Sequence, residues 1–428
     1  MKRTCFLILM VLWVQVGLTQ QKQLVIGLEL RPRLLLDDGY KNPKANDDPV
    51  LAYITQRTRL NASYQQQQFE AYFSLQDVRV WGGDNQYSSS GIFGNTGSLS
   101  LHQGWFILKP IKTLSIKTGR QLFQYDDQRI ISSRNWNDYQ ITYDAVLIQF
   151  DNAKDKIDIG LTWNSETINT FLYPQVKFKI FDFIRYERIF RDFNISAIAL
   201  ITGNTVSDTV SSIYLKGTYG LNLLLDITNL HARITGYFQN NLNQNGTRLH
   251  AFCFSLLAQY DVFQKRASFS IGVDYLSGQD ETKTSNKYNR TNHRFDKLYG
   301  RRHGWYGYID FFPPIPEQGL QDYYLKADYR PWKKLTLQLD GHFFWLASNK
   351  YNVDGSGDIL KKNLGQELDF TLIWKIMDVV SLQGGYSFYL MTETLRQVKG
   401  VNNTSTRFPQ FAYIMITAKP ELFCLGKK

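Results

Sequence analysis

The sequence has 428 residues and a formal net charge of +11, with 43% hydrophobic, 15% aromatic and 20% charged residues. After residue 20 it contains no apolar run approaching the roughly 20 residues of a membrane-spanning helix, which excludes helical membrane proteins. The composition suits a soluble protein, and equally a transmembrane β-barrel whose strands carry one apolar and one polar face. Three cysteines in a chain of this length exclude a disulfide framework, and we expect Cys253 and Cys424 to be unpaired.

The first residues have the features of a secretory signal peptide. Lys2 and Arg3 form a basic region before the apolar run Phe6–Val14, and small residues suitable for cleavage follow. We therefore expect a signal peptide over residues 1–19 and one domain over residues 20–428. A buried N-terminal strand or helix is the alternative.

From residue 24 onwards, successive segments alternate between apolar and polar residues, which is the period of a half-buried β-strand. In Leu24–Leu36, the side chains of Glu29, Arg31 and Arg33 share one face and leucines occupy the other. The segment Leu114–Arg129 begins as a strand and ends in a charged cluster. We predict strands over 24–36, 51–64, 69–80, 99–108, 114–125, 141–150, 156–164, 173–188, 194–202, 211–225, 231–239, 248–260, 267–276, 322–330, 335–346, 364–375, 379–390 and 410–419.

Long and short connections alternate between these segments, as in barrels with tight turns at one end and long loops at the other. The count of about 18 strands is even and would leave an aqueous bore. Closure into a ring also removes the sheet edges that promote aggregation. We therefore predict an all-β fold, a single antiparallel transmembrane β-barrel. A soluble propeller or sandwich is the alternative, with shorter strands and without this rhythm.

Two local features qualify the regular pattern. Near Gln76-Asp77 the alternation of strand 69–80 shifts by one residue, which indicates a β-bulge. The longest connection, 277–321, is rich in aromatic residues and contains Arg301-Arg302-His303. That composition suits a constriction inside the bore, an external lid or a solvated loop.

Several short motifs resemble the bacterial alginate-export porin family. They are Gly119-Arg120-Gln121, Tyr125-Asp126-Asp127-Gln128-Arg129, Gln56–Leu60, Ser74–Trp81, Leu101–Trp105, Leu298-Tyr299-Gly300 with His303, Gly365–Leu372 and Phe411–Phe423. The resemblance implies an outer-membrane barrel of eighteen strands whose lumen is lined with Arg and Lys. In the family's alginate exporter, that lining passes an anionic polysaccharide.

Basic residues lie on the polar faces or at the ends of the early strands, where they would line the path of an anionic solute. The lumen-lining candidates are Arg31, Arg33, Arg57, Arg59, Arg79, Lys117 and Arg129. The acids expected to support them are Glu29, Asp77, Asp126 and Asp127. Arginine suits this role because its planar guanidinium matches a carboxylate. Alternatively, these pairs only brace the wall. Arg120 falls on the apolar face unless a bulge reorients it.

We therefore interpret the chain as an outer-membrane porin or exporter that passes anionic or carbohydrate solutes by diffusion. We expect no cofactor and no metal site, and as partners the outer-membrane lipid, the solute and the barrel-assembly machinery. No HExxH or Gly-x-Ser-x-Gly motif indicates catalysis, and we do not expect an enzyme. The alternatives are a general or sugar-selective porin, and outside transport a barrel enzyme or an adhesin.

Overall fold

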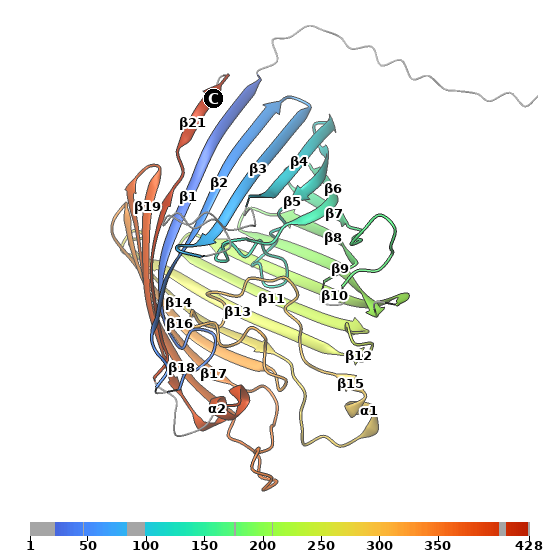
Figure 1. Cartoon of the computed structure of the whole chain (residues 1–428), viewed down its shortest axis with the longest axis vertical. Helices are drawn as coiled ribbons and strands as arrows, with labels where there is room; N and C mark the ends of the chain where they lie inside the picture. The colour runs from blue at the N-terminus through green and yellow to red at the C-terminus, as the bar shows by residue number, and fades with distance from the viewer. Residues whose placement is uncertain are drawn as a thin grey trace, which may run out of the picture.

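The computed structural model describes residues 22–45, 47–83, 99–174, 177–207, 209–401 and 408–426, and the predicted signal peptide lies outside these ranges. Within them, eighteen strands form one closed antiparallel barrel, as predicted (Figure 1). The strands of the ring are β1 (Gln23–Asp38), β2 (Leu51–Gln66), β3 (Phe69–Val80), β4 (Ser100–Ile111), β5 (Leu114–Gln121), β6 (Tyr143–Asp151), β7 (Asp155–Leu161), β8 (Ile180–Ile189), β9 (Phe193–Ser207), β10 (Val210–Ile227), β11 (Leu230–Asn241), β13 (Ala251–Val262), β14 (Ala267–Leu276), β16 (Leu320–Trp332), β17 (Leu335–Trp345), β18 (Asn363–Met377), β19 (Val380–Met391) and β20 (Gln410–Ala418).

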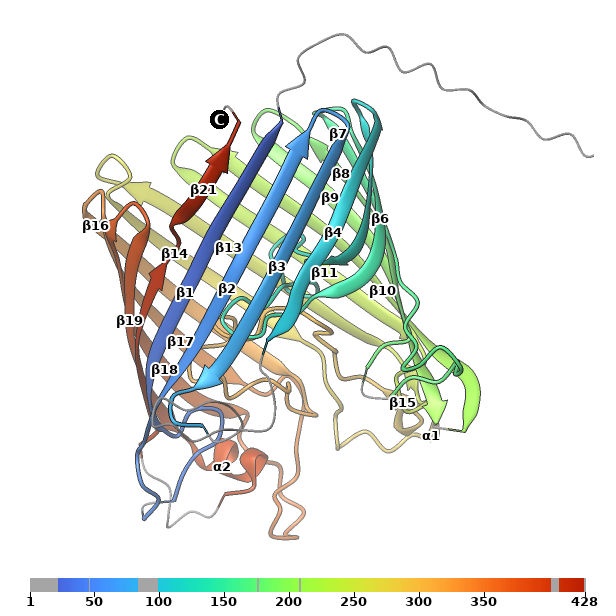
Figure 2. The same ribbon diagram turned by 45° about the horizontal axis from the view of Figure 1, so that its top comes forward.

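The ring closes because β20 pairs with β19 on one side and with β1 on the other. The chain then continues past Pro420 as β21 (Glu421–Leu425), which extends the pairing along Leu24–Gly27 of β1. The sequence pattern did not predict this last strand. The beginning of β1 and the end of β21 therefore lie side by side, at the end of the barrel that carries the short turns (Figure 2).

Three predicted details were wrong. Strand 173–188 begins only at Ile180. Strand 248–260 is interrupted at His250, so that β12 (Arg248–Leu249) leaves the wall and pairs in parallel with β15 (Thr291–Asn292). The irregularity expected near Gln76-Asp77 occurs in the β3–β4 pairing, where Ser74 opposes Gln103 and Leu75 opposes Leu101. The additional residue is in β4, so β3 keeps its alternation.

The two faces of the wall differ as period-two patterning requires. Large apolar side chains on the outer face are exposed, for example Leu221 at 64%, Ile271 at 62% and Leu325 at 54%. The inner face carries buried polar and charged groups instead. An exposed apolar belt around a closed ring is the surface that a bilayer covers.

Long connections gather at the end opposite the termini, and β9–β10 is an exception with a short connection there. The helices α1 (Asn286–Asn289) and α2 (Glu393–Lys399) belong to long connections. Among the described residues, no helix combines the length and apolar character needed to cross a membrane. Cys253 and Cys424 are free, as expected.

Candidate functional site: an arginine cluster in the bore

Four arginines of two neighbouring strands point into the bore. Arg31 and Arg33 alternate with apolar residues on β1, and Arg57 and Arg59 alternate with Gln56, Thr58 and Leu60 on β2. The register places Arg31 opposite Arg57, so the guanidinium groups gather in one patch. Their exposed fractions lie between 1% and 5%. We call these four residues the arginine cluster.

The connection between β5 and β6, residues 122–142, covers the arginine cluster from inside the barrel; we call it the first inner connection. Asp138 accepts hydrogen bonds from Arg31 Nη2 at 2.8 Å and from Arg33 Nη2 at 2.9 Å, one at each carboxylate oxygen. Backbone carbonyls add to this arrangement, since Arg31 Nη1 donates to Asn135 O at 2.7 Å and Arg33 Nη1 to Trp136 O at 2.9 Å. Asp138 therefore bridges two arginines of β1.

The remaining two arginines have different partners. Arg57 pairs with Glu29, and its Nε donates to Glu29 Oε1 at 2.8 Å. Arg59 donates to the amide oxygens of Gln76, at 2.8 and 3.0 Å, and of Gln140, at 2.7 Å. No described carboxylate forms an ion pair with Arg59. Four guanidinium groups thus face two carboxylates, which leaves the patch cationic.

Some donor atoms of the arginine cluster are also unused. Arg31 Nε, Arg33 Nε and Arg57 Nη1 are buried and have no hydrogen-bond acceptor within the described part of the chain. A buried donor without an acceptor loses the free energy of its interaction with water. These three donors therefore stay without a partner within the described part of the chain.

Asp138 remains ionised in this surrounding. Burial acts to raise the pKa of its carboxyl group, but the charges of Arg33 and Arg31 outweigh burial and hold the pKa below its usual range. The contribution of Asp138 to stability is therefore complete above the unfolded-state pKa of about 3.9 and is lost as the pH falls through the lower folded-state value.

The connection between β14 and β16, residues 277–319, also folds inside the barrel; we call it the second inner connection. Trp136 of the first inner connection stacks on His303 of the second, with ring centroids 3.7 Å apart and planes 9° from parallel. His303 Nδ1 lies 3.3 Å from Asp310 Oδ2, and Tyr40 Oη donates to the same oxygen at 2.7 Å. His303 and Asp310 of the second inner connection therefore pack against the first inner connection and against Tyr40.

The first inner connection reaches the opposite wall as well. Arg129 donates from Nη1 to Asp274 Oδ2 of β14 at 2.7 Å, and from Nε to Asp127 Oδ2 at 2.9 Å. Arg185 of β8 donates from Nη2 to Asp126 Oδ1 at 2.7 Å. Because residues 126–129 contact β8 and β14 while residues 135–140 contact β1 and β2, this connection crosses the bore. We call Arg129 and Arg185 with their carboxylates the brace.

Two other candidates lie apart from the arginine cluster. Lys117 of β5 faces the bore, with its Nζ 3.9 Å from the ring centroid of Trp105. Arg79 of β3 is on the outer face and pairs with Asp77 at 2.6 Å. Arg79 faces outward because β3 contains no bulge to turn it inward. Arg120 is also on the outer face, paired with Asp144 at 2.8 Å.

Sequence reasoning missed Asp138, Trp136, Tyr40 and Asp310, which hold the inner connections together. They lie in long connections, where period-two patterning gives no orientation. A cavity of about 560 Å³ lies beside the arginine cluster. Its lining includes Tyr40, Trp136 and Asp138, together with Arg33 and Tyr53. No group of three or more His, Cys, Asp and Glu side chains among the described residues is arranged to hold a metal ion.

The barrel resembles solved porin structures. It superposes on Pseudomonas aeruginosa OpdL with a TM-score of 0.63 and 12% identity, covering 94% of this chain and 99% of that one. Pseudomonas aeruginosa OccK9 (OpdG) and a BenF-like porin from Pseudomonas fluorescens Pf-5 each superpose with a TM-score of 0.61 and 12% identity. Both alignments cover 93% of this chain, and they cover 98% of OccK9 and 99% of the BenF-like porin. No significant match was found among curated protein sequences.

A closed 18-stranded ring with an apolar outside and a polar inside is the architecture of an outer-membrane porin, and this chain is a porin of the cell outer membrane. More particularly, residues 23–165 match the family model for alginate export. This match confirms the resemblance found in the sequence and includes its motifs from Gln56–Leu60 to Arg129. The motifs near residues 298–303, 365–372 and 411–423 lie outside the matched range.

Proposed function

We propose that the porin favours anionic solutes, including acidic carbohydrates, and that the arginine cluster is the element that selects them. The observation that carries the proposal is the ratio of four buried, bore-facing guanidinium groups to two carboxylates. Fixed cations replace part of the hydration of an anion, and neighbouring carboxylates keep the binding weak enough for release. Catalysis has no part in the proposed role.

The cavity beside the arginine cluster supports the carbohydrate part of the proposal. Tyr40, Tyr53 and Trp136 line it together with Arg33. Aromatic side chains offer a flat apolar face and a polar tip, which matches the alternation of C–H and hydroxyl groups on a sugar. Arg33 lies 4.2 Å from the centroid of the Trp136 ring, so a cation and an aromatic surface are presented together.

The test is the reversal potential of the purified barrel in a planar bilayer under a salt gradient. Arg59→Gln is the most informative variant because it removes a cation that has no carboxylate partner, and so leaves no unpaired acid. A unit charge about 8 Å from the ion, at an effective dielectric of about 20 and partly screened, is equivalent to roughly 1 kcal/mol, or about five-fold in the ratio of anion to cation permeability.

Arg120→Gln is the matched control. It removes the same charge from the outer face of β5, where Arg120 pairs with the exposed Asp144, and should leave the reversal potential unchanged. Equal reversal potentials for the wild type and Arg59→Gln would remove the arginine cluster from the conducting path. A wild-type channel without preference for anions would favour a general or sugar-selective porin.

A further inference from the structure

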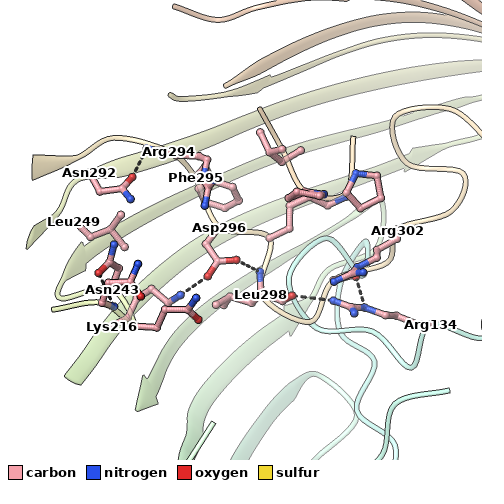
Figure 3. A pocket seen from close by; sticks show the side chains of 17 residues that line it. Arg134, Lys216, Asn243, Leu249, Asn292, Arg294, Phe295, Asp296, Leu298 and Arg302 are labelled. Atoms are coloured by element: carbon pink, nitrogen blue, oxygen red, sulfur yellow. Dashed lines mark hydrogen bonds and ion pairs between the residues drawn. The ribbon is translucent and has the colours of Figure 1, made fainter. Parts of the chain in front are cut away.

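A second basic pocket lies away from the arginine cluster, where the two inner connections meet the ends of β10–β12. It has a volume of about 230 Å³, and Figure 3 shows the side chains that line it. Its charged lining residues are Arg134 of the first inner connection, Lys216 of β10, and Arg294, Asp296, Lys297 and Arg302 of the second. We call it the mouth pocket, because it is on the long-connection side of the barrel.

Two of its five cations are neutralised by carboxylates. Lys216 pairs with Asp296, and Arg294 pairs with Glu317. The other three, Arg134, Lys297 and Arg302, form no ion pair with a described carboxylate. The mouth pocket therefore contains three basic side chains that have no carboxylate partner in the described part of the chain.

The contacts of these three cations differ. Arg134 donates to the backbone carbonyls of Gly300 and Leu298, both at 2.8 Å. Lys297 is only 9% exposed, and its Nζ has no hydrogen-bond acceptor among the described residues and lies 4.1 Å from the centroid of the Tyr306 ring. Arg302 is exposed at the side of the pocket where Arg134 also lies (Figure 3). A ligand can therefore reach Arg302 from outside.

Burial and the repulsion between like charges disfavour the charged forms of Arg134 and Lys297. Burial, and then the charge of Arg302, lower the pKa of Arg134 to about 10. Burial, followed by the charges of Arg129 and Arg134, lowers the pKa of Lys297 well below its ordinary value. A bound anion would offset this repulsion, since an opposite charge within a few ångströms favours the charged form of each cation.

Amide groups surround the cations. Asn243, Gln244, Asn245 and Asn292 line the same pocket. A side-chain amide both donates and accepts hydrogen bonds, as recognition of hydroxyl groups requires. The volume is below the roughly 300–1,000 Å³ of pockets that enclose a drug-sized ligand, so it suits one small unit.

We propose that the mouth pocket is an anion-binding site for a small hydroxylated carboxylate. This proposal rests on the proposed function in one respect, because the ligand is taken to be an anion on its way to the arginine cluster. Arg134 directly precedes Asn135, whose backbone and side-chain oxygens accept hydrogen bonds from Arg31 and Arg57. The first inner connection thus joins the two sites.

The experiment measures the binding of gluconate to the full-length barrel in detergent by isothermal titration calorimetry, with glucose as the neutral probe. We expect gluconate to bind and glucose not to bind. Arg302→Gln should weaken gluconate binding at least five-fold. Asn245→Asp, which adds a negative charge at an exposed position of the pocket, should weaken it similarly without removing any existing contact of Arg302.

Arg191→Gln is the matched control. Its side chain is 95% exposed in the short turn between β8 and β9, at the other end of the barrel, and it should leave gluconate binding unchanged. Equal gluconate affinities for the wild type, Arg302→Gln and Asn245→Asp would overturn the proposed site. Inorganic phosphate binding more tightly than gluconate would overturn the proposed ligand class.

Failure of this proposal is distinguishable from failure of the proposed function. Arg59→Gln should change the reversal potential and leave gluconate binding at the mouth pocket intact. Arg302→Gln should weaken gluconate binding with a smaller effect on the reversal potential. If Arg59→Gln alone abolished gluconate binding, the ligand would occupy the arginine cluster and the mouth pocket would be excluded.

Discussion

The arginine cluster and the brace contain the same side-chain type in the same bore, and they differ in how many carboxylates accompany it. In the cluster, four arginines share Glu29 and Asp138. In the brace, Arg129 alone contacts Asp127 and Asp274, and Arg185 contacts Asp126 and Glu187. We therefore propose that an arginine facing the bore is available to a passing anion only where arginines outnumber carboxylates.

Hydrogen bonding reinforces the difference. Arg129 also donates to Ser255 Oγ at 2.9 Å and to Tyr306 Oη at 2.7 Å, and its side chain is 1% exposed. In the cluster, by contrast, three guanidinium nitrogens lack acceptors among the described residues. The sequence was compatible with arginines that line the path of the solute and with arginines that only brace the wall. The arginine cluster is the candidate for the first role, and Arg129 with Arg185 is the candidate for the second.

The largest expected effect comes from breaking the brace. Arg129→Gln leaves Asp127 and Asp274 buried without their partner, and removal of one member of a buried ion pair costs about 3–5 kcal/mol. Urea unfolding of the barrel in detergent micelles, followed by gel mobility, should show this loss. Arg129→Gln combined with Asp274→Asn should recover part of it. A loss below about 1 kcal/mol for Arg129→Gln would mean that this contact does not support the inner connection.

At the arginine cluster, a smaller loss of stability is expected, together with a rise in the preference for anions. Asp138→Asn removes a carboxylate that competes with solute for Arg31 and Arg33, so the preference for anions should rise by about five-fold on the same electrostatic reasoning as for Arg59. Stability should fall by roughly 1.5–3 kcal/mol, because hydrogen bonds to a charged group are lost. Reversal potentials and urea unfolding of the same preparation report the two effects separately.

A different result for Asp138→Asn would remove the proposed difference between the arginine cluster and the brace. If Asp138→Asn lowered stability and left selectivity unchanged, the arginine cluster would be a second brace. Asp126→Asn is the corresponding change in the brace, and there selectivity should stay constant because Arg185 keeps Glu187.

The smallest effect concerns the contact between the two inner connections and depends on pH. Burial lowers the pKa of His303, and the charges of Arg301 and Arg33 act in the same direction, while Asp310 opposes them. The packed form therefore favours neutral His303, so its stability is complete above the unfolded-state pKa of about 6.5 and decreases as the pH falls below it. Each unit of pKa lowering corresponds to about 1.4 kcal/mol.

Hydrogen exchange of residues 295–312 between pH 8 and pH 5 measures this dependence, with protection expected to fall on acidification. His303→Phe preserves an aromatic ring against Trp136 and removes the titrating group, so its protection should depend less on pH in this range. The same pH dependence in His303→Phe and in the wild type would assign the effect to another group, such as Asp310.

The sequence by itself determined the wall of this protein. Alternation in segments such as Leu24–Leu36 predicted strands, their orientation and an eighteen-strand count, because a strand that faces lipid on one side and water on the other must repeat every two residues. It also predicted that Arg31, Arg33, Arg57 and Arg59 share the polar face. Arg79 was misplaced because a local shift in pattern cannot show which strand of a pair contains the bulge.

Only the tertiary structure decided what fills the bore and which charges remain uncompensated. Asp138 meets Arg31 across more than a hundred residues, and Trp136 meets His303 across an even longer stretch of sequence. Such contacts depend on how long connections fold inside the closed ring, and no local periodicity encodes them. The balance of charge at each wall, and hence the proposed path of an anion, follows from those long-range contacts.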